Sequence, residues 1–133
     1  MDAVTVVAKV FVLNHDNLIM VLRRSSTDTH RPLTWDLPGG GVDYGEDPKD
    51  AVIREAQEEA GLSIKSPTIV YTGSNNDDKY VIRLLYYTFS DQTEIKLSDE
   101  HDKVMWVTKD QFVALDLPDY FKEAVQLLPE IMG

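Results

Sequence analysis

The chain has 133 residues, a net charge of −10 at pH 7 and no cysteine. This length suits one domain over residues 1–133. The negative surplus disfavours duplex nucleic acid and anionic membranes as partners, and the lack of cysteine excludes disulfides and thiolate metal sites. No apolar run reaches the ~20 residues that span a bilayer. The N-terminal residues lack the basic cluster of a signal peptide, so we expect none. We therefore expect a cytoplasmic protein, and composition leaves a homo-oligomer open.

The expected elements are strands on both sides of one central helix, with further helices at the end of the chain. Hydrophobic patterning and turn residues predict strands at 4–13, 18–22, 35–37, 64–73, 80–89 and 104–108. The central helix is expected at 48–60, and the closing helices at 109–114 and 119–128. Pro38–Gly41 is expected to close the strand at 35–37. This order predicts a mixed α/β sandwich.

The central helix has a clear beginning and end in the sequence. Asp47 is an N-cap residue, and Pro48 suits the first helical position. Gly61 suits the left-handed conformation that often ends a helix. The helix is therefore expected to occupy 48–60.

Three glutamates gather on one side of this helix. Successive helical residues turn by ~100°, so Glu55, Glu58 and Glu59 share a wedge of about 100° beside the apolar stripe. Like charges at i+3 and i+4 destabilise a helix by a few tenths of a kcal/mol, and a divalent cation would remove that repulsion. Oxygen ligands favour Mg²⁺ or Mn²⁺, since no histidine lies on this helix. For an isolated pair of glutamates, a solvated helix face is the commoner interpretation.

Residues 40–62 resemble the Nudix box, a glycine and a glutamate followed by Arg-Glu-x-x-Glu-Glu-x-Gly at fixed spacing. The positions that fit are Gly40, Glu46, Arg54, Glu55, Glu58, Glu59, Gly61 and Leu62. Ala56 departs from the pattern because it is smaller than the usual aliphatic residue, which affects packing and leaves the chemistry unchanged. The resemblance implies the family fold, an α/β/α sandwich around a mixed β-sheet.

The resemblance also implies a function and a metal site. Glu55, Glu58 and Glu59 would be the metal-binding acids, and the carbonyl of Gly39 would be a further ligand. The family hydrolyses a diphosphate linkage in a nucleoside diphosphate joined to a group X, with water as the nucleophile. The substrate would be a small nucleotide, such as a nucleoside triphosphate, an oxidised nucleotide, a dinucleoside polyphosphate or a nucleotide sugar. A bound Mg²⁺ would reverse the local negative charge and acidify a bound water.

Two glutamates are candidates for the general base that accepts the proton of this water. One is Glu55; the other is Glu100, which precedes a Trp-Val strand, as a glutamate does in the family. A solvated loop acid is the alternative for Glu100, because its loop is acidic throughout. The resemblance further implies that Arg54 pairs with Glu46 and orients the helix.

The candidates for substrate contact are weaker. Residues in or near the loop at 25–34, or on a strand, offer a basic or aromatic side chain: Arg23, Arg24, Arg31, Trp35 and Tyr80. Strand alternation directs one of the two adjacent arginines inward without showing which. The tryptophan suits base stacking or core packing, and the tyrosine resembles a feature of members that act on dinucleoside polyphosphates. The loops at 25–34 and 74–79 are expected to determine selectivity.

A second function remains open beside hydrolysis. Some Nudix modules bind a nucleotide without cleaving it, and these commonly lose acids of the box. This chain retains all of them. We therefore expect an enzyme, with a non-catalytic nucleotide sensor as the alternative.

Overall fold

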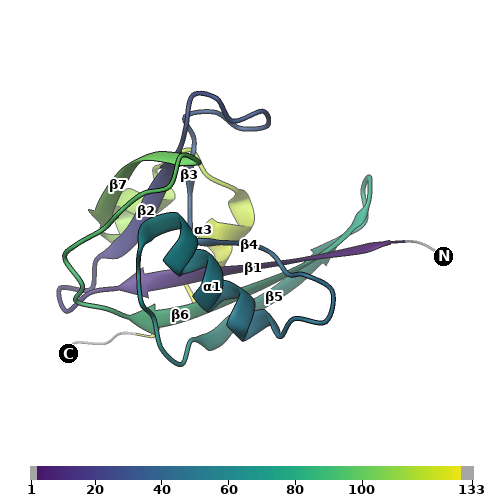
Figure 1. The fold of residues 1–133 in the computed structure, drawn as a ribbon, viewed down its shortest axis with the longest axis horizontal. Coiled ribbons are helices and arrows are strands. Elements are labelled where there is room, and N and C mark those ends of the chain that lie inside the picture. The colour runs from purple at the N-terminus through teal and green to yellow at the C-terminus, as the bar shows by residue number, and fades with distance from the viewer. Residues whose placement is uncertain (1–2, 130–133) are drawn as a thin grey trace.

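The computed structural model describes residues 3–129 (Figure 1). The strands are β1 (Val4–Leu13), β2 (Ile19–Arg24), β3 (Trp35–Asp36), β4 (Gly39–Gly41), β5 (Thr68–Asn75), β6 (Tyr80–Phe89) and β7 (His101–Val107). The helices are α1 (Pro48–Ala60), α2 (Lys109–Val113) and α3 (Asp119–Val125). Within the described residues, no helix is long and apolar enough to cross a membrane.

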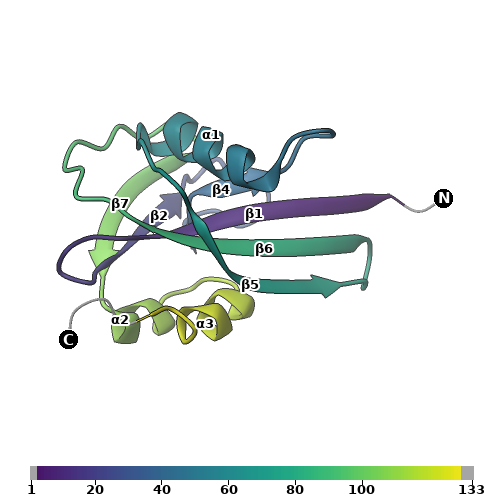
Figure 2. The same ribbon diagram turned by 90° about the horizontal axis from the view of Figure 1, so that it is seen from below.

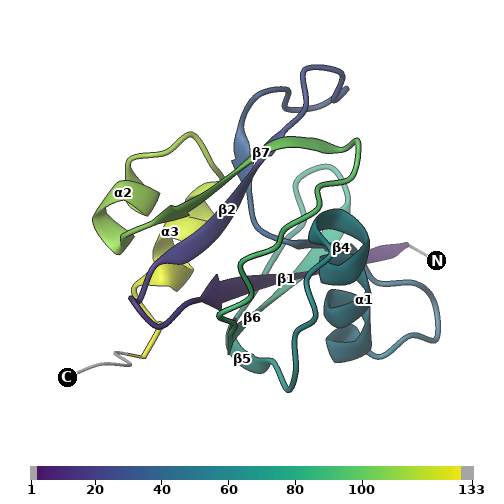
Figure 3. The same cartoon turned by 60° about the vertical axis from the view of Figure 1, so that its left-hand side comes forward.

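The strands form one mixed sheet in the order β3-β2-β1-β6-β5, with β4 paired to β1 and β7 paired to β2. β1 and β6 run parallel along their whole length, whereas the other pairs are antiparallel. β1 and β2 share a register only at Leu13 and Ile19. The sheet therefore divides into one part around β1 and β6 and another around β2 and β7. Figure 3 shows strands β2 and β7 side by side.

Helices cover both faces of this sheet, as Figure 2 shows. α1 covers one face, where Val10, Met20 and Val52 belong to the buried cluster beneath it. α2 and α3 cover the other face, where Phe112 and Phe121 are fully buried in a second cluster. The odd and even positions of β1 supply these two clusters in turn, as strand geometry requires. The α/β/α sandwich expected from the sequence is confirmed.

The boundaries of α1 agree with the prediction. Asp47 accepts a hydrogen bond from the backbone N–H of Lys49, and Pro48 begins the helix. Gly61 ends it with a φ of 63° in the left-handed region. Local capping chemistry therefore fixes the segment that carries the acids.

The sequence predicted no strand within Pro38–Gly41, but Gly39–Gly41 forms β4 against β1. The close approach explains the difference. Gly39 has a φ of +133°, and a Cβ built on it would lie 2.2 Å from the carbonyl oxygen of Ala8. Only glycine allows the two strands to meet in this way.

Other boundaries differ too, and three of them differ by three residues or more. The strand expected at 64–73 begins at Thr68, because Ile64 is buried in the cluster under α1 before the chain enters the sheet. α3 ends at Val125, three residues before the expected end at 128. β7 begins at His101 instead of 104 because it pairs with β2 as far as Arg24. This last change brings a histidine to the edge of the acidic helix.

Candidate functional site

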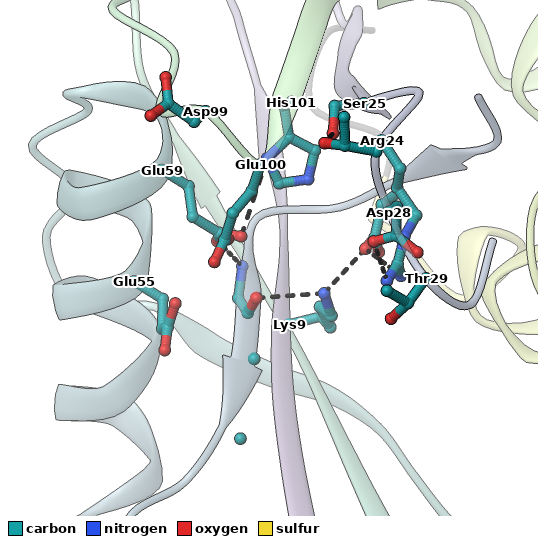
Figure 4. Close-up of a pocket in the computed structure, with 15 residues that line it drawn as sticks. Lys9, Arg24, Ser25, Asp28, Thr29, Glu55, Glu59, Asp99, Glu100 and His101 are labelled. Carbon is teal, nitrogen blue, oxygen red and sulfur yellow. Dashed lines mark hydrogen bonds and ion pairs between the residues drawn. The ribbon is translucent and has the colours of Figure 1, made fainter. Parts of the chain in front are cut away.

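A pocket of about 540 Å³ lies where α1, β4 and the beginning of β7 meet the loop after β2 (Figure 4). Its volume falls in the range of small-ligand sites. Charged and polar side chains, with three glycines, make up its lining: Lys9, Arg24, Ser25, Thr27, Asp28, Thr29, Asp36, Gly39, Gly40, Gly41, Glu55, Glu59, Asp99, Glu100 and His101. The acids of α1 thus face the cations of β1 and β2 across one cavity.

Glu59 is the most buried acid of this pocket, with 5% of the residue exposed. Its Oε1 accepts a hydrogen bond of 2.7 Å from the backbone N–H of Gly39. Burial raises the pKa of Glu59 to about 8, against the opposing effects of Lys9 and the Gly39 N–H. Burial also raises the pKa of Glu55, although the positive charge of Arg54 acts to lower it. Two carboxyl groups therefore lie in a place where a further cation would stabilise their charged forms.

A histidine completes this acidic side. Ligand atoms of Glu59, Glu100 and His101 all lie within 4.8 Å of one another. The Nδ1 atom of His101 is buried and has no hydrogen-bond partner among the described residues. Burial lowers the pKa of His101, which favours the neutral ring. The orphaned nitrogen and the acids beside it fit a divalent cation.

Sequence reasoning missed His101. Its only signal was its place directly after Glu100, and the pairing of β7 with β2 is what brings it to the pocket.

Lys9 lies on the other side of the pocket, inside an otherwise apolar strand. Its Nζ donates to Asp36 Oδ2 at 3.1 Å, to the carbonyl of Leu37 at 3.3 Å and to the carbonyl of Gly39 at 3.1 Å. Burial disfavours its charge, but Asp36 and Glu59 outweigh this effect and raise the pKa of Lys9. The ammonium group thus holds the segment whose N–H contacts Glu59. The sequence carried one sign of this role, because Lys9 is the only charged residue in the apolar stretch Val4–Leu13.

Replacing Lys9 with Met is expected to lower the free energy of unfolding by about 2 kcal/mol, because its three oxygen partners lose a donor. The cost stays moderate because Asp36 keeps Arg24 as a partner at 3.3 Å. Urea unfolding of metal-free protein measures the change. Lys103→Met on the exposed side of β7 is the control, with an effect within about 0.5 kcal/mol. Equal effects of the two substitutions would contradict the role of Lys9.

The resemblance to the Nudix box implied an ion pair between Arg54 and Glu46, and the structure contains it. Arg54 Nε and Nη2 donate to the two carboxylate oxygens of Glu46 at 2.8 and 3.0 Å. Its Nη1 also donates to Glu55 and Glu58, at 3.2 Å each. Arg54 lowers the pKa of Glu46. Glu58 is held on this guanidinium and lies outside the pocket lining, unlike Glu55 and Glu59.

The substitution Arg54→Lys is expected to weaken the binding of a divalent ion about tenfold. Lysine keeps the charge but cannot hold Glu46 with two parallel bonds while it also contacts Glu55 and Glu58. A titration with Mn²⁺, followed by the loss of the free-ion EPR signal, measures the affinity. Lys49→Gln, at an exposed position on the same helix, is expected to leave it unchanged. If both variants bind Mn²⁺ like the parent, Arg54 does not position the acids.

Of the two adjacent arginines, Arg24 is the one that lines the pocket. It donates to Asp28 at 2.8 Å and to Asp36 at 3.3 Å. Asp28 also accepts the backbone N–H groups of His30 and Arg31, at 2.8 Å each. Arg24 therefore fixes the first half of the loop at 25–34, which forms part of the pocket wall.

The other four candidates for substrate contact lie outside the pocket lining. Arg23 pairs with Asp102, and Arg31 approaches Asp116 at 3.4 Å. Trp35 packs against the buried cluster beneath α2 and α3, which is the core-packing alternative. Tyr80 is 39% exposed at the beginning of β6. Gly39, whose carbonyl was predicted as a metal ligand, lines the pocket; its N–H donates to Glu59 and its carbonyl accepts from Lys9.

Comparison with known proteins agrees with this geometry. The profile of the NUDIX domain matches residues 4–130. The RNA pyrophosphohydrolase of Bartonella quintana is 46% identical over an alignment of 61 positions that covers 42% of this chain and 35% of that protein. The nucleoside triphosphatase NudI of an Enterobacter species is 23% identical over 118 residues, covering 80% of this chain and 84% of the relative.

Among solved structures, the MutT protein from Methanosarcina mazei superimposes with a TM-score of 0.83. It is 28% identical, and the match covers 94% of this chain and 92% of that one. The first of the two relatives above is matched over only about a third of its own length, whereas the MutT structure is matched nearly throughout. Box, fold and profile agree, and the chain belongs to the Nudix family.

Proposed function

We propose that this protein hydrolyses a diphosphate linkage in a small nucleotide, with Mg²⁺ or Mn²⁺ as the required ion. The observation that carries the proposal is the arrangement of Glu55, Glu59 and Glu100 around one pocket of nucleotide size. Membership of the Nudix family and the retained acids of the box support an active enzyme.

The acids of this chain would hold the cation. Glu55 and Glu59 come from α1, and Glu100 comes from the turn before β7. Glu58 belongs to the same box and would join them on leaving Arg54. When bound, a divalent ion neutralises phosphate charge and makes a water more acidic. The carbonyl of Gly39 has a second lone pair free for a ligand role beside its bond from Lys9.

The remaining groups of the pocket suit the substrate. Arg24 is the arginine of the lining, and it faces the acids across the cavity, where a phosphate oxygen would need a donor. The loop segment Ser25–Thr29 supplies hydroxyl groups at the same wall. The relatives named above are an RNA pyrophosphohydrolase and a nucleoside triphosphatase. We therefore propose a substrate with a 5′-triphosphate group as the first to test.

Glu55 and Glu100 both remain proposed as the general base. Glu55 contacts Arg54, whereas Glu100 is exposed to the pocket. Glu55→Gln and Glu100→Gln are to be compared by their pH–rate profiles. The variant that loses the acidic limb of the profile identifies the base.

The test of the function is a panel of nucleotides with and without Mg²⁺ or Mn²⁺, with identification of the products. We expect a nucleoside monophosphate, or a phosphorylated X group, to be released only when the ion is present. Tight nucleotide binding without hydrolysis under either ion would overturn the proposal and favour the nucleotide-sensing module.

A further inference from the structure

The side chain of His101 is 4% exposed and faces the acidic end of the pocket. Its Nδ1 lies 4.0 Å from Glu59 Oε2, beyond hydrogen-bond distance, and has no other partner among the described residues. A buried nitrogen without a partner is costly, and native structures rarely leave one in place without a reason. A ligand between this nitrogen and the carboxylate would supply that reason.

The spacing of the neighbouring oxygens suits a metal ion. Two ligands on opposite sides of one ion are separated by about twice a bond of ~2.1 Å. The 4.0 Å between His101 and Glu59 falls within that span. The Glu100 carboxylate completes a group whose ligand atoms all lie within 4.8 Å of one another. Glu100 is exposed, so its carboxylate is free to move inward and bind the same ion as Glu59 and His101.

The polarity of the surroundings agrees. Glu59 arrives from α1, Glu100 from the turn before β7, and Asp36 from β3, while Lys9 and Arg24 are already engaged with Asp36. The cations of the pocket thus lie at its other side. The acidic end is where a cation is needed.

We propose that the imidazole of His101 is a nitrogen ligand of the candidate metal centre, together with Glu59 and Glu100. The inference rests on the proposed function, because it concerns the ion which that function requires. Nitrogen ligation shifts preference from Mg²⁺, which takes oxygen ligands, toward transition ions such as Mn²⁺. The sequence favoured an oxygen-only site because no histidine lies on α1. The fold adds one from β7.

The decisive measurement uses the intact protein loaded with Mn²⁺ and no nucleotide. Electron spin echo spectroscopy detects a nitrogen bound to Mn²⁺ through its hyperfine coupling. We expect a ¹⁴N coupling in the parent protein and its replacement by a ¹⁵N coupling when only the histidines are labelled with ¹⁵N. Absence of a histidine coupling from bound Mn²⁺ would overturn the proposal, and no substitution is needed to see it.

A pair of variants assigns the coupling to this residue. His101→Phe is expected to remove the coupling and to weaken Mn²⁺ binding about tenfold, while Mg²⁺ binding changes less than about twofold. His30→Phe, in the exposed part of the loop at 25–34, is the matched control and should change neither. Equal losses for both ions in His101→Phe would contradict the inference. A coupling present in a protein that hydrolyses no nucleotide would preserve this inference and defeat the proposed function alone.

Discussion

Replacing Glu59 with Gln is expected to lower the rate of metal-dependent hydrolysis by about 10²- to 10³-fold and to stabilise the metal-free protein increasingly as the pH rises toward 8. The two effects have one cause, the burial of a carboxylate that only a bound cation would balance fully. Gln keeps the oxygen that accepts the Gly39 N–H at 2.7 Å, so the beginning of β4 keeps its anchor. What the substitution removes is the charge.

The pH dependence of this stabilisation follows from the pKa values. The pKa of Glu59 rises from 4.5 to about 8 on folding. Below pH 4.5 the group is protonated in both states, and folding carries no penalty from it. As the pH rises toward 8, the unfolded chain loses the proton more readily, so the parent protein loses stability. The advantage of Glu59→Gln therefore grows across this window, to roughly 2–4 kcal/mol at pH 8.

Urea unfolding with a chelator at pH 5 and pH 8 measures this difference, and the turnover assay measures the rate. Glu94→Gln is the control, because Glu94 is exposed and lies outside the pocket lining. We expect saturating Mn²⁺ to abolish the stability advantage at pH 8, since the ion binds the folded parent. A variant that is less stable than the parent at pH 8 would show that Glu59 serves the fold as a charged partner of Lys9.

The parts of this site that the sequence predicted are those fixed by local geometry. The caps of α1 and the spacing of its glutamates depend on neighbours within one or two turns. The pair between Arg54 and Glu46 joins the helix to the loop just before it. Short range is what makes such features readable from a pattern.

The parts that the sequence missed depend on strands far apart in the chain. Lys9 reaches the pocket because β4 pairs with β1, and His101 reaches it because β7 pairs with β2. For Trp35, which suited base stacking or core packing, the sheet decides for core packing. Strand alternation could not decide between Arg23 and Arg24, because the register shifts between them. Tertiary pairing, which no local pattern encodes, determined each of these outcomes.

Gly39→Ala adds one methyl group and is expected to destabilise the protein by about 4 kcal/mol or more. This is the largest loss of stability that we expect from any substitution in the site. Gly39 has a φ of +133°, where a side chain is strained. Its added Cβ would lie 2.2 Å from the oxygen of Ala8 and 2.6 Å from Cα of Lys9, both backbone atoms of β1. Neither can turn aside as a side chain would, so β4 must move away from β1.

Gly41→Ala, on the same strand, is the matched control, because a Cβ there meets nothing within 4 Å. Its effect should stay within about 0.5 kcal/mol. Urea unfolding compares the two variants, and Mn²⁺ titration of any folded Gly39→Ala protein adds a second measure. Displacement of β4 withdraws the N–H from Glu59 and the carbonyl from Lys9, so metal affinity should fall about tenfold or more. If Gly39→Ala matches Gly41→Ala in both measures, the close contact between β4 and β1 does not hold the acidic end of the pocket in place.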